Sequence, residues 1–440
     1  MTKNKATEVR STEDLVAAFA AAAAEAEKTR RRELEEEEGL DNIIKSSDWD
    51  RVREWFVAHP PSPQPSSDAG STRVLSMQRR HRRGHRLHQL CSIGSCPSSL
   101  IDLVASQYPD AVSEPDFSRY GDTPLHVACR NSQTSTDKVR VLLQHLRRIC
   151  DVQGENPSCE AILVRNTFGG TALHSAANHN AVIDVLEMLV NCNPSILKVK
   201  TTRDGVHAVS ALWSSYIQTI PGYMSVSKIL EGGDVGGGIV EDGVGGHFER
   251  FWKKVEFLAS EYYFLTSCGG GSSDAAAGAA DDADGVDPTL RREDCVLHGL
   301  LMCNVAINMY RVALRRPNSR KMAATADRRD GNLALHRLVR DRPFRLKERD
   351  AIVETVRAYP GAVRVGNGDG DAPLAVAIRN KVPYTNGVDA IVGADPDSTL
   401  RCRDAETGLY PFQLAAAVGG KVALETTYRL LRTLPDLLRG

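Results

Sequence analysis

The chain has 440 residues, of which 42% are hydrophobic and 25% are charged, a composition typical of a folded globular protein. Its formal net charge of −1 gives no overall attraction to nucleic acid or to anionic membranes, so nucleic-acid binding is not expected. The apolar stretch Ala17–Ala24 is too short and too closely flanked by charges to cross a bilayer, so membrane insertion is not expected either. Its ten cysteines include no Cys-x-x-Cys pair, which favours a reducing compartment. We therefore expect an intracellular protein, cytoplasmic rather than nuclear.

The N-terminal residues 1–39 predict a charged helical arm that is partly disordered. Within it, Ser11 and Asp14 form a capping-box pattern at the start of an alanine-rich segment. The segment Ser11–Glu38 ends in a run of glutamates and has no continuous apolar stripe, so we expect a solvated, loosely attached helix.

The clearest helix-start signal lies in Tyr120–Asn131, YGDTPLHVACRN. Thr123 suits the N-cap, Pro124 suits the first helical position, and Leu125 begins an apolar stripe. A second copy, Phe168–Asn180, has the sequence FGGTALHSAANHN. The two copies predict that one helical unit recurs along the chain.

Two landmarks support this repeat. The first is a Leu-His dipeptide or its equivalent, and the intervals from His88 to His126 and from His298 to His336 are both 38 residues. The second is an amphipathic helix that ends at a proline, which cannot continue a helix. These helices are predicted at Trp49–Pro60, Leu100–Pro109, Val182–Pro194, Ile352–Pro360 and Leu424–Pro435.

The tetrapeptide Thr-Pro-Leu-His at Thr123–His126 resembles the start of the first helix of an ankyrin repeat, and the resemblance extends from Leu40 to Gly440. It implies an all-α, ankyrin-type solenoid of stacked helix-turn-helix repeats, with repeats at residues 40–230 and 294–440. In that family, the Thr and His of the motif hydrogen-bond to each other and to neighbouring backbone. The resemblance therefore implies a structural role for His88, His126, His174, His298 and His336.

Residues 231–293 interrupt the repeats with one long flexible insertion. The tracts Glu231–Gly246 and Ser267–Asp287 are rich in Gly, Ala and Asp, as flexible linkers are. Residues 247–265 between them predict one helix, which is interpreted as a displaced second helix of a repeat.

No motif in the chain indicates catalysis, so we expect no enzyme activity and no cofactor, catalytic or metal site. Cys91 and Cys96 lie near His85 and His88, a grouping that suggests a metal site, but their register indicates structural positions in a helix and the following loop. The glycines of Gly232–Gly246 suggest a phosphate cradle, but no Lys-Ser/Thr follows them, which favours a linker.

Two groups of arginines allow alternative interpretations. The segment Arg73–Arg86 carries six arginines and no acidic residue, and predicts a nuclear-import signal, a phosphate-binding patch or a solvated loop. Arg130, Arg340 and Arg379 share one repeat position and would form a basic ladder for an acidic peptide. Alternatively, they complement the dipoles of their helices, with Asn131 and Asn380 as left-handed caps.

The leading hypothesis is a monomeric, non-catalytic scaffold that binds another protein on the concave face of the solenoid. One alternative is a nuclear or regulatory protein acting through residues 73–86, and another is an enzyme or enzyme regulator using residues 205–294. The residues expected to contact the partner are Arg119, Tyr120, Arg130, Asn178, His179, Arg340 and Arg379.

Overall fold

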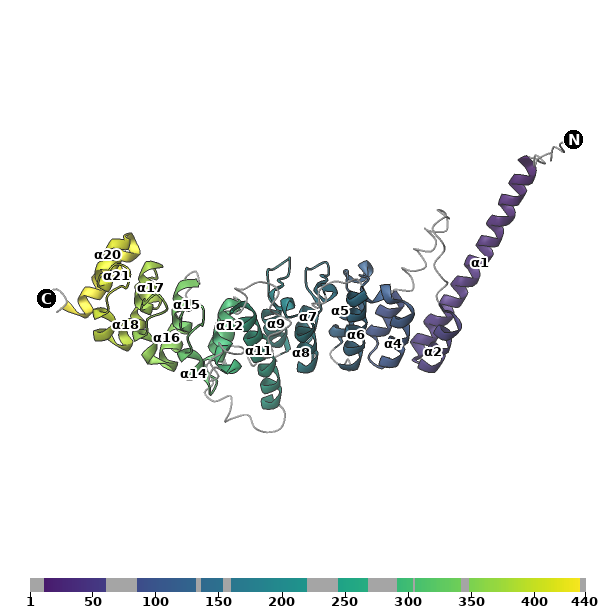
Figure 1. The fold of residues 1–440 in the computed structure, drawn as a ribbon. Coiled ribbons are helices and arrows are strands. Elements are labelled where there is room, and N and C mark those ends of the chain that lie inside the picture. Colours follow the sequence, from purple (N-terminus) through teal and green to yellow (C-terminus); the bar gives the residue numbers. More distant parts are fainter. Residues whose placement is uncertain are drawn as a thin grey trace. The chain divides into compact units, whose positions relative to one another are not determined.

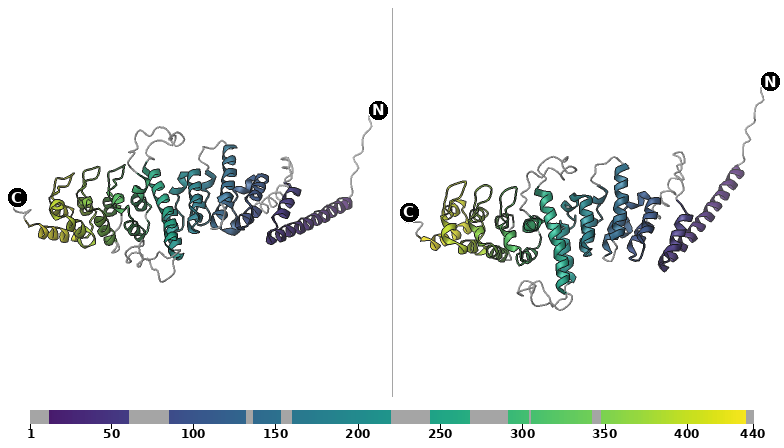
Figure 2. Two further views of the ribbon diagram at one scale, coloured as in Figure 1. Left: turned by 90° about the horizontal axis from the view of Figure 1, so that it is seen from below. Right: turned by 60° about the horizontal axis from the view of Figure 1, so that its bottom comes forward.

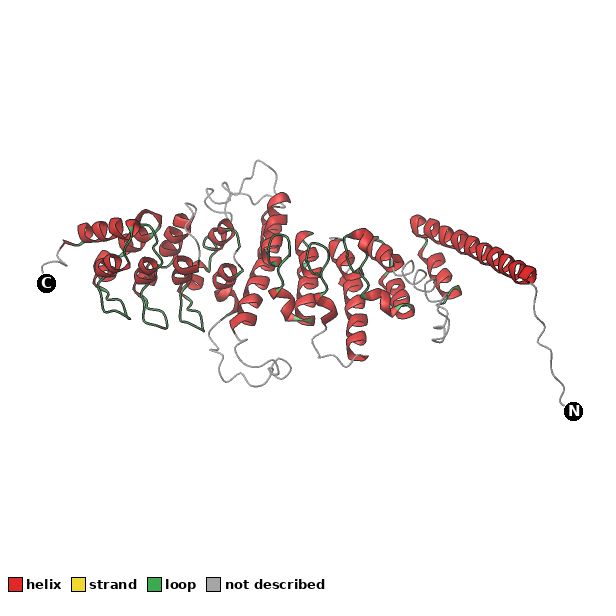
Figure 3. Ribbon diagram, turned by 90° about the horizontal axis from the view of Figure 1, so that it is seen from above, coloured by secondary structure: helices red, strands yellow, loops and turns green. Residues whose placement is uncertain are grey.

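A computed structural model describes residues 12–60, 85–131, 136–152, 160–219, 244–267, 291–303, 305–341 and 348–435. These residues form α-helices and short 3-10 helices and contain no strand, which confirms the predicted all-α class (Figure 3). The chain divides into two compact units, Met1–Glu114 and Pro115–Gly440, which we call unit 1 and unit 2.

Unit 1 begins with a helix that is longer than predicted. This helix runs without a break past residue 39, so the predicted boundary of the arm falls inside a helix. Leu40 and Ile44 are buried, and this burial anchors the end of the helix to the rest of the unit. The helices of unit 1 are α1 (Thr12–Ser46), α2 (Trp49–Ala58), residues 85–92, α4 (Ser98–Gln107) and the 3-10 helix η1 (Pro109–Val112).

Unit 2 is a stack of short inner helices (Figure 1), four of which carry the Leu-His dipeptide of the predicted repeat. Neighbouring members of the stack contact each other, except that one longer helix, α11 (Val244–Ser267), stands between the third and fourth members and contacts both. The inner helices are α5 (Pro124–Arg130), α7 (Ala172–Asn178), α9 (Ala208–Thr219), α12 (Val296–Met302), α15 (Ala334–Asp341), α17 (Pro373–Arg379) and α20 (Pro411–Val418).

The helix predicted at residues 247–265 is therefore present with wider bounds. Phe251, Val255 and Leu258 are buried on one side of it, as their helical spacing predicts. Because α11 contacts both α9 and α12, it joins the two parts of the stack. The tracts on either side of it, residues 220–243 and 268–290, lie outside the described residues.

An outer helix follows most inner helices, and several outer helices lead into a short proline-initiated helix. Pro109, Pro194 and Pro360 begin such turns, which confirms the predicted role of these prolines. Pro396 begins another that the sequence analysis did not include. The outer helices and the short helices that connect the repeats are α6 (Thr136–Val152), η3 (Glu160–Leu163), α8 (Ile183–Cys192), η4 (Pro194–Lys198), η5 (Arg292–Cys295), α13 (Ile307–Ala313), α14 (Ser319–Ala324), α16 (Glu348–Ala358), η6 (Pro360–Arg364), η7 (Tyr384–Asn386), α18 (Val388–Ala394), α19 (Pro396–Arg401) and α21 (Lys421–Thr433).

A tight loop, which we call a finger, precedes six of the inner helices. In each finger the first residue donates its backbone N–H to the carbonyl of the last residue, over 2.8–3.0 Å. Figure 2 shows the three fingers nearest the C-terminus projecting side by side from their helices. The first to sixth fingers are residues 116–122, 166–170, 201–206, 327–332, 367–371 and 404–409.

Glycine allows neighbouring fingers to approach closely. Gly169, in the second finger, has φ +74°, and a Cβ atom added to it would lie 2.4 Å from the backbone nitrogen of Thr202 in the third finger. Gly205 has a similar φ, +62°, but nothing lies within 4 Å of an added Cβ. At Gly205 glycine is favoured only by its positive φ, whereas at Gly169 it is favoured both by its positive φ and by the lack of space for a side chain.

We expect Gly169→Ala to destabilise the protein more than Gly205→Ala. Both variants place alanine in the left-handed region, at a cost of about 1–2 kcal/mol. Gly169→Ala also forces two fingers apart, which we expect to add about 1–3 kcal/mol. Chemical denaturation followed by circular dichroism measures the difference. Equal losses for the two variants would show that close contact between fingers contributes nothing to stability.

Candidate protein interface

Histidine side chains attach four of the inner helices to the backbone that lies in, or just before, the following finger. The Thr123 backbone N–H donates to His126 Nδ1 over 3.3 Å, and the Thr123 hydroxyl lies 2.8 Å from the same nitrogen. His126 Nε2 lies 3.1 Å from the carbonyl oxygen of Gly170 in the next finger. A carbonyl only accepts, so Nε2 carries the proton and the ring is the neutral Nε2–H tautomer.

The same bridge recurs along unit 2. The Nε2 atoms of His174, His298 and His336 donate to Val206, Thr325 and Asp371 carbonyls over 2.9–3.1 Å. In the last inner helix glutamine replaces histidine, and the Tyr410 backbone N–H donates to Gln413 Oε1 over 3.0 Å. These contacts confirm the structural role that the ankyrin resemblance implied for His126, His174, His298 and His336.

Burial keeps these imidazoles neutral. It lowers the pKa of His174 and of His336 from the ordinary value of 6.5 to about 4, because a charged ring would lose its hydration. Since the unfolded chain binds protons more readily than the folded one, the stability due to each ring is complete above pH 6.5. It is lost as the pH falls towards 4.

We predict that the free energy of unfolding decreases between pH 6.5 and pH 4, by roughly 3 kcal/mol for each of these two rings. The double variant His174→Gln/His336→Gln should flatten this dependence, because a glutamine amide does not titrate. The measurement is urea denaturation at a series of pH values, with His179→Gln, at an exposed position, as the control. An unchanged pH dependence in the double variant would contradict the proposed origin of the effect.

The arginines expected to contact a partner are bound to carboxylates of this chain. Four of these carboxylates, those of Asp116, Asp122, Asp371 and Asp404, are buried in the fingers and would be costly to leave without a cation. The basic ladder is therefore charge-compensated within unit 2. The ion pairs join Arg119 to Asp116, Arg130 to Asp122, Arg340 to Asp330 and Asp341, and Arg379 to Asp371 and Asp404.

The predicted left-handed caps at Asn131 and Asn380 are wrong. Their φ angles are −84° and −83°, in the ordinary negative range. The left-handed residues near the ends of inner helices are instead Asn180, with φ +52°, and Lys381, with φ +57°. After α17 the left-handed conformation therefore falls one residue later than expected, at Lys381 instead of Asn380.

Asn178 and His179 lie at the C-terminal end of α7, whereas the fingers precede the N-terminal ends of the inner helices. Both are exposed, and the carbonyl of Asn178 accepts a 2.6 Å hydrogen bond from the Ser215 hydroxyl. Of the seven predicted contact residues, Arg119 and Tyr120 belong to a finger, and the others lie on or directly after inner helices.

An exposed group of aromatic side chains lies on the first two fingers. Phe117, Tyr120 and Phe168 are 73%, 58% and 39% exposed, and we call them the aromatic surface. The rings of Tyr120 and Phe168 lie 5.3 Å apart between centroids. The Thr167 backbone N–H donates to the Tyr120 carbonyl over 2.8 Å, which fixes one finger against the other.

Sequence reasoning identified Tyr120 but missed Phe117 and Phe168. The signal was available, since Phe168 directly precedes Gly169 in NTFGGT and Phe117 lies four residues before Gly121 in DFSRYGD. Tyr120 has φ +64°, a conformation that bulky residues rarely adopt. Such a conformation persists only where the surrounding structure holds it, and it is found most often at functional sites.

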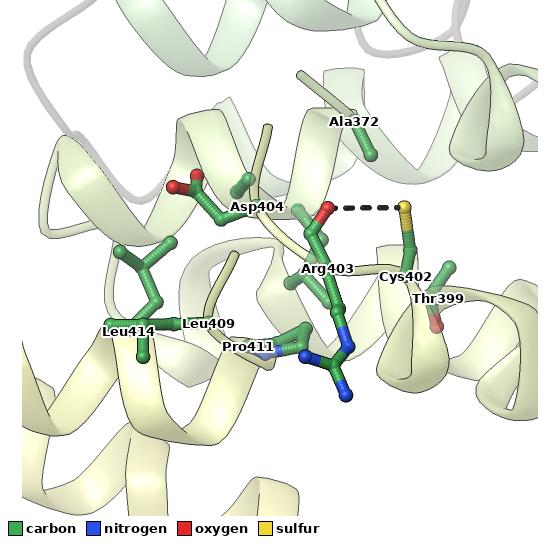
Figure 4. A pocket seen from close by; sticks show the side chains of 10 residues that line it. Ala372, Thr399, Cys402, Arg403, Asp404, Leu409, Pro411 and Leu414 are labelled. Atoms are coloured by element: carbon green, nitrogen blue, oxygen red, sulfur yellow. Dashed lines mark hydrogen bonds between the residues drawn. The ribbon is translucent and has the colours of Figure 1, made fainter. Parts of the chain in front are cut away.

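Other candidate sites are weaker. A hollow lined by Leu374, Cys402, Leu409 and Pro411, among others, has space for little more than one water molecule (Figure 4). Within the described ranges, no group of three or more His, Cys, Asp or Glu side chains is arranged to hold a metal ion. Cys91 lies in the helix at residues 85–92, Cys96 follows it, and both are buried.

The alternative functions depend on segments of which little is described. Of Arg73–Arg86, only the last two residues belong to the described part of the chain, and Arg86 binds the Asp41 carboxylate and, over 3.0 Å, Gln89 Oε1. Much of the insertion within residues 205–294 also lies outside the described ranges. In the helices that the structure describes, none is both long and apolar enough to span a membrane.

Comparison with known proteins agrees with the repeat geometry. Residues 87–200 match the family model described as ankyrin repeats (3 copies). No curated protein matches the chain. The matched segment contains the bridge from His126 to Gly170 and the aromatic surface. The chain therefore contains ankyrin repeats, which the family model matches at residues 87–200.

Proposed function

We propose that this protein is a non-catalytic scaffold that binds another protein through the aromatic surface of unit 2. Ankyrin repeats generally mediate protein–protein interaction. The observation that carries the proposal is the exposure of Phe117, Tyr120 and Phe168 on two fingers that are hydrogen-bonded to each other. We infer that a partner covers these rings.

Two physical arguments favour this surface over the predicted arginine ladder. Aromatic side chains supply large contact areas and are enriched among the residues that dominate binding energy. Their positions are also fixed before binding, because the two fingers share a backbone hydrogen bond and Tyr120 contacts Phe168. Less conformational entropy is therefore lost when a partner binds. Arg130, Arg340 and Arg379, in contrast, would have to exchange carboxylates of this chain for those of a partner.

To test the proposal, a photo-crosslinking phenylalanine analogue is placed at Phe168 in the full chain within native cells. We expect a specific covalent adduct with one partner protein. The same analogue at Tyr428, an exposed aromatic position of α21, is the matched control. Adducts from Tyr428 but not from Phe168 would place the interface on α21 and contradict the proposal.

We further predict that Phe117→Ala/Tyr120→Ala/Phe168→Ala weakens binding of the captured partner at least about 30-fold, since aromatic anchors contribute about 2 kcal/mol or more each. Titration calorimetry with purified partner measures this loss. The three side chains are exposed, so the thermal unfolding midpoint should change little. Binding at full strength by a folded triple variant would exclude the aromatic surface as the contact site.

A further inference from the structure

Exposed cationic side chains lie on the chain segments that adjoin the aromatic surface. Arg165 immediately precedes the second finger, Lys200 immediately precedes the third finger, and Arg203 lies within it. All three are exposed, and within the described ranges none forms an ion pair. The Thr202 backbone N–H donates to the Phe168 carbonyl over 3.1 Å, so Arg203 follows a residue that contacts the aromatic finger directly.

The last three fingers differ in their exposed side chains. Several of their carboxylates are paired with arginines of the inner helices, as in the contacts of Asp330 with Arg337 and Arg340 and of Asp404 with Arg379. Arg328 and Arg403, in and beside these fingers, are exposed and form no ion pair within the described ranges. The exposed large hydrophobic side chains of unit 2 include none from these fingers. Exposed cations without an ion pair therefore occur at several fingers, but they coincide with exposed aromatic rings at the first three.

We propose that the first three fingers bind an acidic segment of a partner protein that also carries an aromatic or aliphatic side chain. This inference rests on the proposed function and adds the chemistry of the partner. The apolar side chain contacts Tyr120 and Phe168, and neighbouring carboxylates pair with Arg165, Lys200 and Arg203. The carboxylate of Asp204, exposed in the third finger, disfavours additional acidic groups at that point.

Charge complementarity of this kind selects the partner more than it increases affinity. Exposed ion pairs each contribute little, and salt screens them. A surface of positive charge nevertheless increases the rate at which acidic segments are encountered, and it repels basic segments. The inference therefore predicts a preference in sequence and a dependence on ionic strength, both of which are measurable without the natural partner.

The test is selection from a random 12-residue peptide display library on the purified full chain, with the triple alanine variant of the aromatic surface for counter-selection. Peptides that require the aromatic surface should be enriched in Asp and Glu around one aromatic or aliphatic residue. Their affinity, measured by fluorescence anisotropy, should fall about tenfold or more in the variant Arg165→Glu/Lys200→Glu/Arg203→Glu. It should also fall as salt is raised.

The matched control is Arg320→Glu/Arg357→Glu/Lys421→Glu, which changes the net charge equally at exposed positions of α14, α16 and α21. It should retain binding within about twofold. Selected peptides that need the aromatic surface but are neutral or basic would overturn this inference and leave the proposed function intact. If no selected peptide needs the aromatic surface, both proposals fail. Thermal unfolding of both charge variants confirms that they are folded.

Discussion

The hydrogen bond from a buried, neutral histidine to backbone near the next finger is the interaction on which the stacking of α5, α7, α12 and α15 depends. An inner helix of seven or eight residues is too short to be stable alone, and its first turn exposes backbone N–H groups. In α5 one histidine nitrogen accepts from the helix start, and the other donates across 44 residues of sequence to Gly170. Each repeat thus depends on its neighbour, and stability belongs to the stack.

Ion pairs between fingers and inner helices supply the second constraint. Asp122 is completely buried and is paired with Arg130, and Arg379 pairs with carboxylates in two successive fingers. Removing one partner would leave an uncompensated buried charge, so these pairs hold the fingers in fixed positions. Their geometry also shows that equally spaced arginines in a repeat can serve carboxylates of the same protein, as Arg130, Arg340 and Arg379 do.

The sequence predicts local elements well because the determining residues are close in the chain. Thr123, Pro124 and His126 define a helix start, and Pro194 or Pro360 defines the end of an outer helix turn. The sequence does not predict the contacts that form between repeats. The carboxylate partner of Arg379 in the next finger is 25 residues away, and the contact of Phe168 with Tyr120 joins loops 48 residues apart in sequence. The misplaced cap at Asn380 reflects a different limit, since Asn tolerates both signs of φ and its identity alone does not choose between them.

The hydrogen bond from His126 to Gly170 helps to hold the aromatic surface in place. His126 donates to the carbonyl of Gly170, two residues after Phe168, and Gly169 between them is the position where the second finger meets the third. The second finger also holds the unusual backbone conformation of Tyr120, because the Tyr120 carbonyl accepts a hydrogen bond from the Thr167 backbone N–H. A change that weakens the bridge at His126 would therefore loosen both rings without touching either of them. The rigidity that a binding surface needs is in this way derived from the interaction that stacks the repeats.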